Sequence, residues 1–192
     1  MKTETTRSIL FLLIAVILFG CASGKGYLDL AKATSKPGLD MYKARLGILP
    51  LRSYPADLGY VISVTIGNEL RDTGIKIVET AKMISLLKAQ NITPRSVTHS
   101  SDYQEIGRVC DVDYLLVGEA VITILSKKFV RTGIAPADFQ ETTAEIVDTT
   151  SGGVVLRTSV ERPPKEKWNR ADIIGDALAA AIKKELKQYK QP

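Results

Sequence analysis

Apolar residues along the chain form one unbroken run near its start and regular repeats after it. The run, Ile9 to Phe19, has eleven residues without a polar side chain and follows a short start that contains Lys2 and Arg7. As a helix it would be roughly 17 Å long, well short of the hydrocarbon core of a bilayer at about 30 Å. A positive start before a short apolar run is typical of an export signal, so we expect residues 1–20 to be a signal peptide.

The apolar run ends at a cysteine. Leu18-Phe19-Gly20-Cys21 resembles the lipobox of bacterial lipoproteins, although Phe19 stands where a small residue is usual. The resemblance implies cleavage between Gly20 and Cys21, a thioether-linked diacylglycerol on Cys21, and a further acyl chain such as palmitate on its amine. Several acyl chains give stable membrane anchoring. Ala22 after the cysteine favours the outer membrane in the sorting pattern of Gram-negative lipoproteins. An uncleaved anchor and a Cys21–Cys110 disulfide are the alternatives.

The stretch 22–42 shows no sustained period. It contains Gly24, Gly26, Pro37 and Gly38, and we expect it to be a flexible tether. About twenty flexible residues average roughly 25 Å end to end, with a stretched limit near ~70 Å. The folded part should therefore lie close to the membrane.

From Lys43 onward the spacing of apolar residues becomes regular. Between Leu58 and Leu70 they recur at three- and four-residue steps, which predicts one buried helix face. Proline at the start of this helix and glycine after it are typical helix boundaries. The elements expected in this half are a strand over 44–51, a helix from Pro55 to Gly74, a strand over 75–79 and a helix over 81–90.

The second half continues the alternation of helix and strand. The continuous apolar run from Tyr114 to Gly118 predicts a central strand buried on both faces, which could continue through Ile124. The expected elements are a helix opened by a capping box at Ser101 and Gln104, this central strand, strands over 139–148 and 154–160 joined by a turn at 148–153, and a last helix capped by Asn169. The order predicts an α/β fold: a single mixed β-sheet with helices packed on it, formed by one domain over residues 43–192.

Composition and charge bear on the class of partner that the protein could bind. The chain has 192 residues and a formal net charge of +5, with lysines spread along it. A nucleic-acid footprint requires a basic stripe with interleaved aromatic residues, so we interpret the lysines as solvated surface and expect no nucleic-acid partner.

No catalytic constellation stands out. His99 is the single histidine and falls in a polar stretch, which leaves a histidine-based triad or multi-histidine metal site without its residues. Asp111 and Asp113 are interpreted as caps or solvated turn residues, and Cys110 as a small buried hydrophobe. Trp168 is expected to pack the last helix onto the sheet, with a partner anchor as the alternative. We expect no cofactor, no metal and no enzymatic activity.

Four stretches together resemble a known family. They are Leu46–Leu51, Glu69–Glu79, Ile106–Gly118 and Ala144–Val155. Their order is similar to the periplasmic domain shared by CsgG, LpoB and related small outer-membrane lipoproteins, and in outline to the amino-terminal domain of TolB. The resemblance implies the α/β fold and action through protein contacts and assembly rather than catalysis.

The function expected from these observations is a non-enzymatic, lipid-anchored accessory or assembly subunit of an envelope complex for secretion, export or cell-wall work. It would face the periplasm from the outer membrane of a Gram-negative bacterium and contact an envelope protein or further copies of itself. A CsgG-type pore needs about 40 residues for two membrane hairpins, and the gap at 126–138 is too short for them. The alternatives are a small-ligand binding module, an activator of a peptidoglycan synthase and an envelope enzyme.

Overall fold

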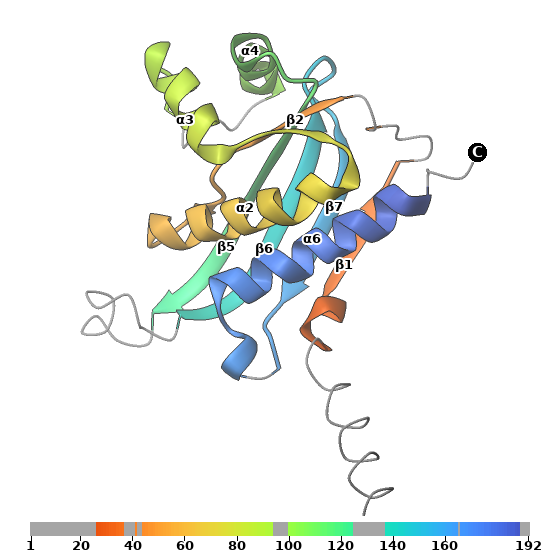
Figure 1. Ribbon diagram of the computed structural model, residues 1–192. Helices are drawn as coiled ribbons and strands as arrows, with labels where there is room; N and C mark the ends of the chain where they lie inside the picture. Colours follow the sequence, from red (N-terminus) through yellow and green to blue (C-terminus); the bar gives the residue numbers. More distant parts are fainter. Residues whose placement is uncertain are drawn as a thin grey trace, which may run out of the picture.

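The computed structural model describes residues 26–36, 41, 44–93, 100–124, 137–164 and 166–188 (Figure 1). The strands are β1 (Ala31–Ser35), β2 (Arg45–Ile48), β3 (Arg52–Ser53), β4 (Lys76–Val78), β5 (Tyr114–Ile124), β6 (Ala137–Asp148) and β7 (Val154–Glu161). The helices are α2 (Ala56–Leu70), α3 (Thr80–Ala89), α4 (Ser100–Cys110) and α6 (Ala171–Gln188), with short 3-10 helices η1 (Gly26–Asp29), η2 (Arg71–Thr73) and η4 (Glu166–Trp168). This arrangement confirms the α/β fold with one mixed sheet.

The sheet has seven strands in the order β1-β7-β6-β5-β2-β4, with β3 also paired to β5. β2 runs parallel to β4 and β5, whereas β5, β6, β7 and β1 form an antiparallel series. The expected hairpin joins β6 to β7, and Gly152 in its turn has a positive φ of 67°. Gly74 ends the segment formed by α2 and η2 with a φ of 83°, as expected for a helix-terminating glycine.

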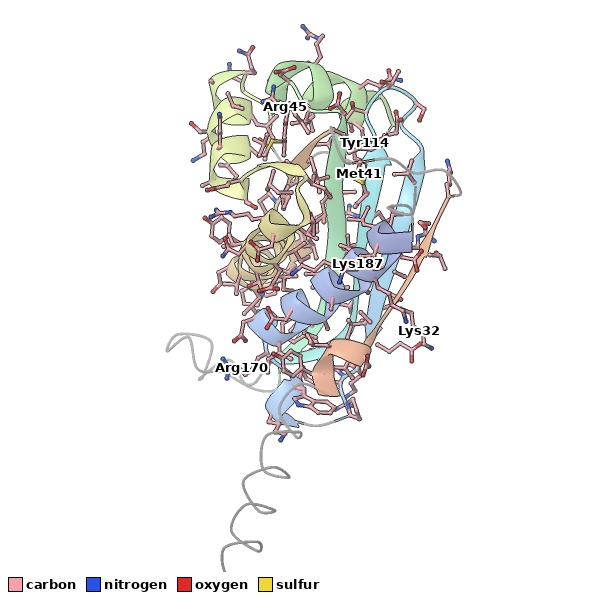
Figure 2. The ribbon with its side chains drawn as sticks, turned by 45° about the vertical axis from the view of Figure 1, so that its right-hand side comes forward. Lys32, Met41, Arg45, Tyr114, Arg170 and Lys187 are labelled. Atoms are coloured by element: carbon pink, nitrogen blue, oxygen red, sulfur yellow. The ribbon has the colours of Figure 1, made fainter. Side chains whose placement is uncertain are left out.

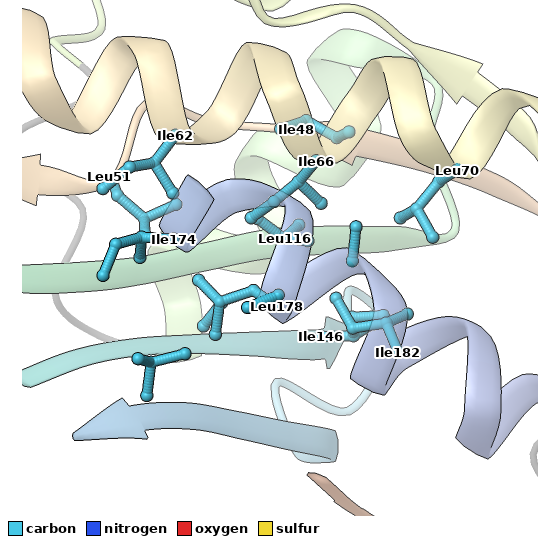
Figure 3. Close-up of a cluster of buried hydrophobic side chains, with 14 of the residues drawn as sticks. Ile48, Leu51, Ile62, Ile66, Leu70, Leu116, Ile146, Ile174, Leu178 and Ile182 are labelled. Atoms are coloured by element: carbon cyan, nitrogen blue, oxygen red, sulfur yellow. The ribbon is translucent and has the colours of Figure 1, made fainter. Parts of the chain in front are cut away.

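Helices pack on both faces of the sheet. α2 and α6 lie side by side across one face, and α3 and α4 lie together at one end of the other face (Figure 1). Leu116 of β5 points into the cluster below α2 and α6, which contains Ile66 and Leu178 (Figure 3). The neighbouring Leu115 points into the second cluster, with Met83 of α3. The central strand is therefore buried on both faces in this part, as its sequence predicted.

A buried serine stabilises the point where the first core strand is interrupted. The strand expected over 44–51 ends at Ile48 and resumes as β3, because Pro50 has no N–H to donate to a ladder. Ser63 of α2 lies beneath this break: its Oγ accepts the Leu51 N–H at 2.9 Å and lies 3.0 Å from the carbonyl oxygens of Leu49 and Gly59. The helix thus satisfies backbone groups that the strand cannot pair.

Residues 26–36 are folded, which corrects the flexible tether expected over 22–42. β1 pairs with β7 from Ala31↔Val160 to Ser35↔Leu156, so the expected order of elements gains an edge strand at its start. The side chains of Tyr27 and Ser35 contact α6: the Tyr27 hydroxyl lies 3.4 Å from Asp176 Oδ2, and Ser35 Oγ donates to Glu185 Oε2 at 2.7 Å. Backbone pairing and the contact with α6 order this stretch despite its weak apolar pattern.

Asn169 connects two segments rather than capping the last helix. Its Oδ1 accepts the Phe139 N–H at 2.8 Å, and its Nδ2 donates to Asp138 Oδ1 at 3.0 Å. The Asp138 carboxylate is buried and is also bonded by Arg162 at 2.9 Å and Gln140 at 2.8 Å. These bonds fix the segment before α6 onto the start of β6, whereas α6 begins at Ala171.

Two threonines on neighbouring strands provide a matched stability test. Thr142 and Thr158 are both buried, but Thr142 Oγ1 has no hydrogen-bond partner among the described residues, whereas Thr158 Oγ1 donates to the Lys32 carbonyl at 2.9 Å. We expect Thr142→Val to raise the free energy of unfolding by about 1–2 kcal/mol, because it removes an unsatisfied hydroxyl. Thr158→Val should lower it by about 1 kcal/mol. Urea unfolding followed by Trp168 fluorescence measures both, and equal losses would contradict the assignment.

Candidate functional site

Most of the residues considered for chemistry have structural partners. Cys110 is a free, buried thiol on the apolar side of α4, and burial raises its pKa, which disfavours the reactive thiolate. Asp111 forms an ion pair with the Arg45 guanidinium, and Asp113 Oδ2 accepts the Arg45 N–H at 2.7 Å. Both carboxylates therefore position the start of β2 beside the start of β5.

Other sequence candidates lie elsewhere. Gly20 and Cys21, expected at the cleavage and lipid-attachment site, and His99 lie outside the described residues, so the lipid-attachment site stays a prediction. Trp168 is half-buried in η4, and its ring lies 3.8 Å from the position that a Cβ on Gly26 would take. It therefore lies beside Gly26 at the start of η1.

The part of the sheet that the described helices leave uncovered is a candidate interaction surface. We call it the open face. Its residues follow from the register, because directly paired residues of neighbouring strands share a face of the sheet. It consists of Arg52 of β3, Val117, Glu119 and Val121 of β5, Glu141, Thr143 and Glu145 of β6, Arg157, Ser159 and Glu161 of β7, and Lys32 and Thr34 of β1.

The open face carries charged side chains of both signs. Arg157 of β7 forms an ion pair with Glu145 of β6 at 2.6 Å, and Arg52 approaches Glu119 at 3.4 Å. Glu141 and Glu161 lie directly opposite each other, and both are exposed. Like charges in this position disfavour pairing of the two strands. Val121, on the same face, is 50% exposed. The face thus combines paired charges, an acidic end and an exposed apolar side chain.

A shallow pocket of about 140 Å³ opens where α4 meets the open face. Arg52, Tyr103, Glu119 and Glu145 line it, together with Leu49 and Pro50. Burial is the main cause that raises the pKa of the Tyr103 hydroxyl, and the negative charge of Glu145 adds to it while Arg52 opposes it.

The pocket and its surroundings provide little for catalysis or tight small-ligand binding. Small-molecule sites usually enclose about 300–1,000 Å³ of mostly apolar space, whereas this pocket is smaller, open and polar. Its two carboxylates face an arginine and a tyrosine, which is no nucleophile–base arrangement. Within the described residues, no group of three or more His, Cys, Asp or Glu side chains could hold a metal ion. None of the described helices is long and apolar enough to cross a membrane.

The sequence reasoning missed the open face as a surface. A sequence pattern for this face exists in β6, where residues of the open face alternate with buried ones. The open-face residues are Glu141, Thr143 and Glu145, and the buried residues are Thr142, Ala144 and Ile146. Such alternation shows that one face of a strand is solvated, but it does not show whether a neighbouring helix covers that face.

The chain is partly similar to several solved structures. No protein-family model and no curated protein matches it. A PelC dodecamer from Paraburkholderia phytofirmans is 17% identical over 84% of this chain and 98% of that chain, with a TM-score of 0.49. Lipoprotein GNA1162 from Neisseria meningitidis is 12% identical over 61% and 80%, with a TM-score of 0.46. The C-terminal domain of LpoB from Salmonella enterica is 12% identical over 66% and 87%, with a TM-score of 0.42.

These similarities concern the general arrangement of helices and strands. The C-terminal domain of LpoB, which belongs to the family that the sequence motifs resemble, is among these structures, and a similarity to CsgG is not shown. At these identities the likeness does not extend to function.

Proposed function

We propose that the chain is a lipid-anchored, non-enzymatic accessory or assembly subunit of an envelope complex, held at the periplasmic face of the outer membrane. The observation that supports it is the open face, a broad charged surface formed by β3, β5, β6, β7 and β1. Non-obligate protein interfaces are about as polar as the rest of a protein surface, and this face has that character. A partner protein, or a further copy of the chain, would bind there.

Site-specific photo-crosslinking in cells tests the open face. A photoreactive side chain at Ser159, at the centre of the face, should give a crosslinked adduct. The same group at Lys184, exposed on α6, should give none. Arg157→Glu should remove the Ser159 adduct, because it breaks the ion pair with Glu145 and places like charges opposite each other.

The crosslinking result also identifies the partner class. An adduct with the mass of two chains indicates self-assembly, and an adduct that contains peptides of a second protein indicates another envelope protein. A strictly monomeric protein that gives no adduct from Ser159 would contradict the proposal.

The anchor is tested separately by Cys21→Ser. Mass spectrometry of the mature wild-type protein should find an amino-terminal Cys21 that carries acyl chains, and the variant should lose both the modification and its membrane association. Cys110→Ser serves as the control, since a buried thiol on α4 should have no part in anchoring. An unmodified wild-type amino terminus would overturn the lipoprotein assignment.

The remaining alternatives are less well supported. A binding module would require a larger apolar cavity than the pocket beside α4. An activator of an inner-membrane peptidoglycan synthase would need a long tether. Gly26 already belongs to η1 of the described fold, which leaves only residues 22–25 between the proposed lipid and the fold.

A further inference from the structure

The residues of η1 and β1 are held firmly against the body of the domain. β1 is paired with β7 along its whole length, and Tyr27 and Ser35 bond to Asp176 and Glu185 of α6. Trp168 contacts Gly26 from the segment that Asn169 joins to β6. The position of Gly26 is therefore fixed relative to the sheet.

The distance from Cys21 to this fixed point is short. Five peptide units separate the two Cα atoms, which limits their separation to about 18 Å even when the chain is fully extended. The tether expected from the sequence had a limit near ~70 Å. A lipid on Cys21 would thus hold one particular end of the domain near the bilayer.

That end can be identified from the register of the sheet. Ala31 pairs with Val160, so η1 lies where β7 ends and η4 follows. We call η1 and η4 together the anchor end, and Arg170 lies beside it (Figure 2). α4 lies at the opposite end of the sheet, where Gln104 bonds the turn between β6 and β7 (Figure 1). β7, with eight residues and a length of roughly 25 Å, separates the two ends.

We propose that the anchor end is a membrane-contact surface that rests on the lipid headgroups, with α3 and α4 directed into the periplasm. This inference rests on the proposed lipid at Cys21. It requires no affinity of the domain itself for lipid, because the short covalent connection restricts the orientation. The strands of the open face would then run roughly perpendicular to the membrane plane, and the face would be exposed to partners beside the protein.

The single tryptophan provides a direct test, because it lies at the anchor end. The full lipidated protein is reconstituted in phosphatidylcholine vesicles that contain dansyl-labelled phosphatidylethanolamine, and energy transfer from Trp168 to the headgroup label is measured. The comparison variant, Trp168→Phe with Tyr103→Trp, moves the reporter to α4. A third variant inserts twenty Gly/Ser residues between Lys25 and Gly26, which adds about 25 Å of average reach.

We expect strong energy transfer from Trp168, loss of most of it in the Tyr103→Trp variant, and loss of most of it on insertion of the linker. Circular dichroism checks that each variant is folded. If Cys21 carries its lipid and both reporters transfer equally, or the insertion changes nothing, the orientation is wrong while the proposed anchor stands. If mass spectrometry of the same preparation finds Cys21 unmodified, both are overturned.

Discussion

Gly59→Ala should lower the free energy of unfolding by about 3 kcal/mol, at the upper end of what overpacking costs. Gly59 lies in the first turns of α2, where the helix backbone rests directly on the strand segment before it. A Cβ at this position would overlap the carbonyl oxygen of Leu51 and lie 2.7 Å from Ser53 Oγ, which accepts the Gly59 N–H. The obstacle is backbone, so relief requires α2 to move away from the sheet.

Gly67→Ala is the matched control in the same helix. A Cβ there would meet only Cδ1 of Ile48, at 3.1 Å, which is the end of a flexible side chain. Both substitutions replace glycine inside a helix and gain the same intrinsic propensity of about 1 kcal/mol. Gly67→Ala should therefore stay within about 1 kcal/mol of wild type. Urea unfolding of both variants separates the clash from propensity, and equal stabilities would show that α2 is not seated as described.

Leu115→Ala and Leu116→Ala should each cost about 2–5 kcal/mol, although the two side chains lie on opposite faces of β5. Both are fully buried, Leu116 below α2 and α6 and Leu115 below α3 and α4. Removing either side chain loses apolar burial and leaves a cavity. Urea unfolding followed by Trp168 fluorescence measures the two losses.

Val121→Ala is the control on the same strand. Val121 belongs to the open face and is half exposed, so its truncation should change stability by no more than about 0.5 kcal/mol. If Leu115→Ala lowered the free energy of unfolding as little as Val121→Ala, α3 and α4 would not cover the sheet at Leu115. The three variants thus map where the second face of β5 passes from core to solvent.

The central elements were predictable because their patterns are strong and local. In the run Tyr114–Gly118 both the odd-numbered and the even-numbered positions are apolar, which is the pattern of a strand buried on two faces. β5 begins with this run. The apolar repeat from Leu58 to Leu70 predicted α2, and the glycine at position 74 predicted where the helical segment ends.

The edge strand and the roles of single polar residues were not predictable in this way. β1 has the sequence AKATS, in which two alanines are the only apolar residues. Its order comes from backbone bonds to β7 and from contacts with α6, and neither leaves an apolar period in the sequence. Asn169 stands where a helix cap is common, yet the backbone of Phe139 and the buried Asp138 carboxylate bind its amide.

The candidate surface, too, was predictable only in part. The sequence by itself determined the α/β order of elements and which strand positions are polar, because these follow from side-chain chemistry at local spacings. Its resemblance to a lipobox led to the proposed lipid on Cys21. Only the tertiary structure decided that the described helices leave part of the sheet open, and that Gly26 already lies within the fold, beside Trp168. Both depend on packing and backbone pairing between residues far apart in the chain, which local spacing does not record.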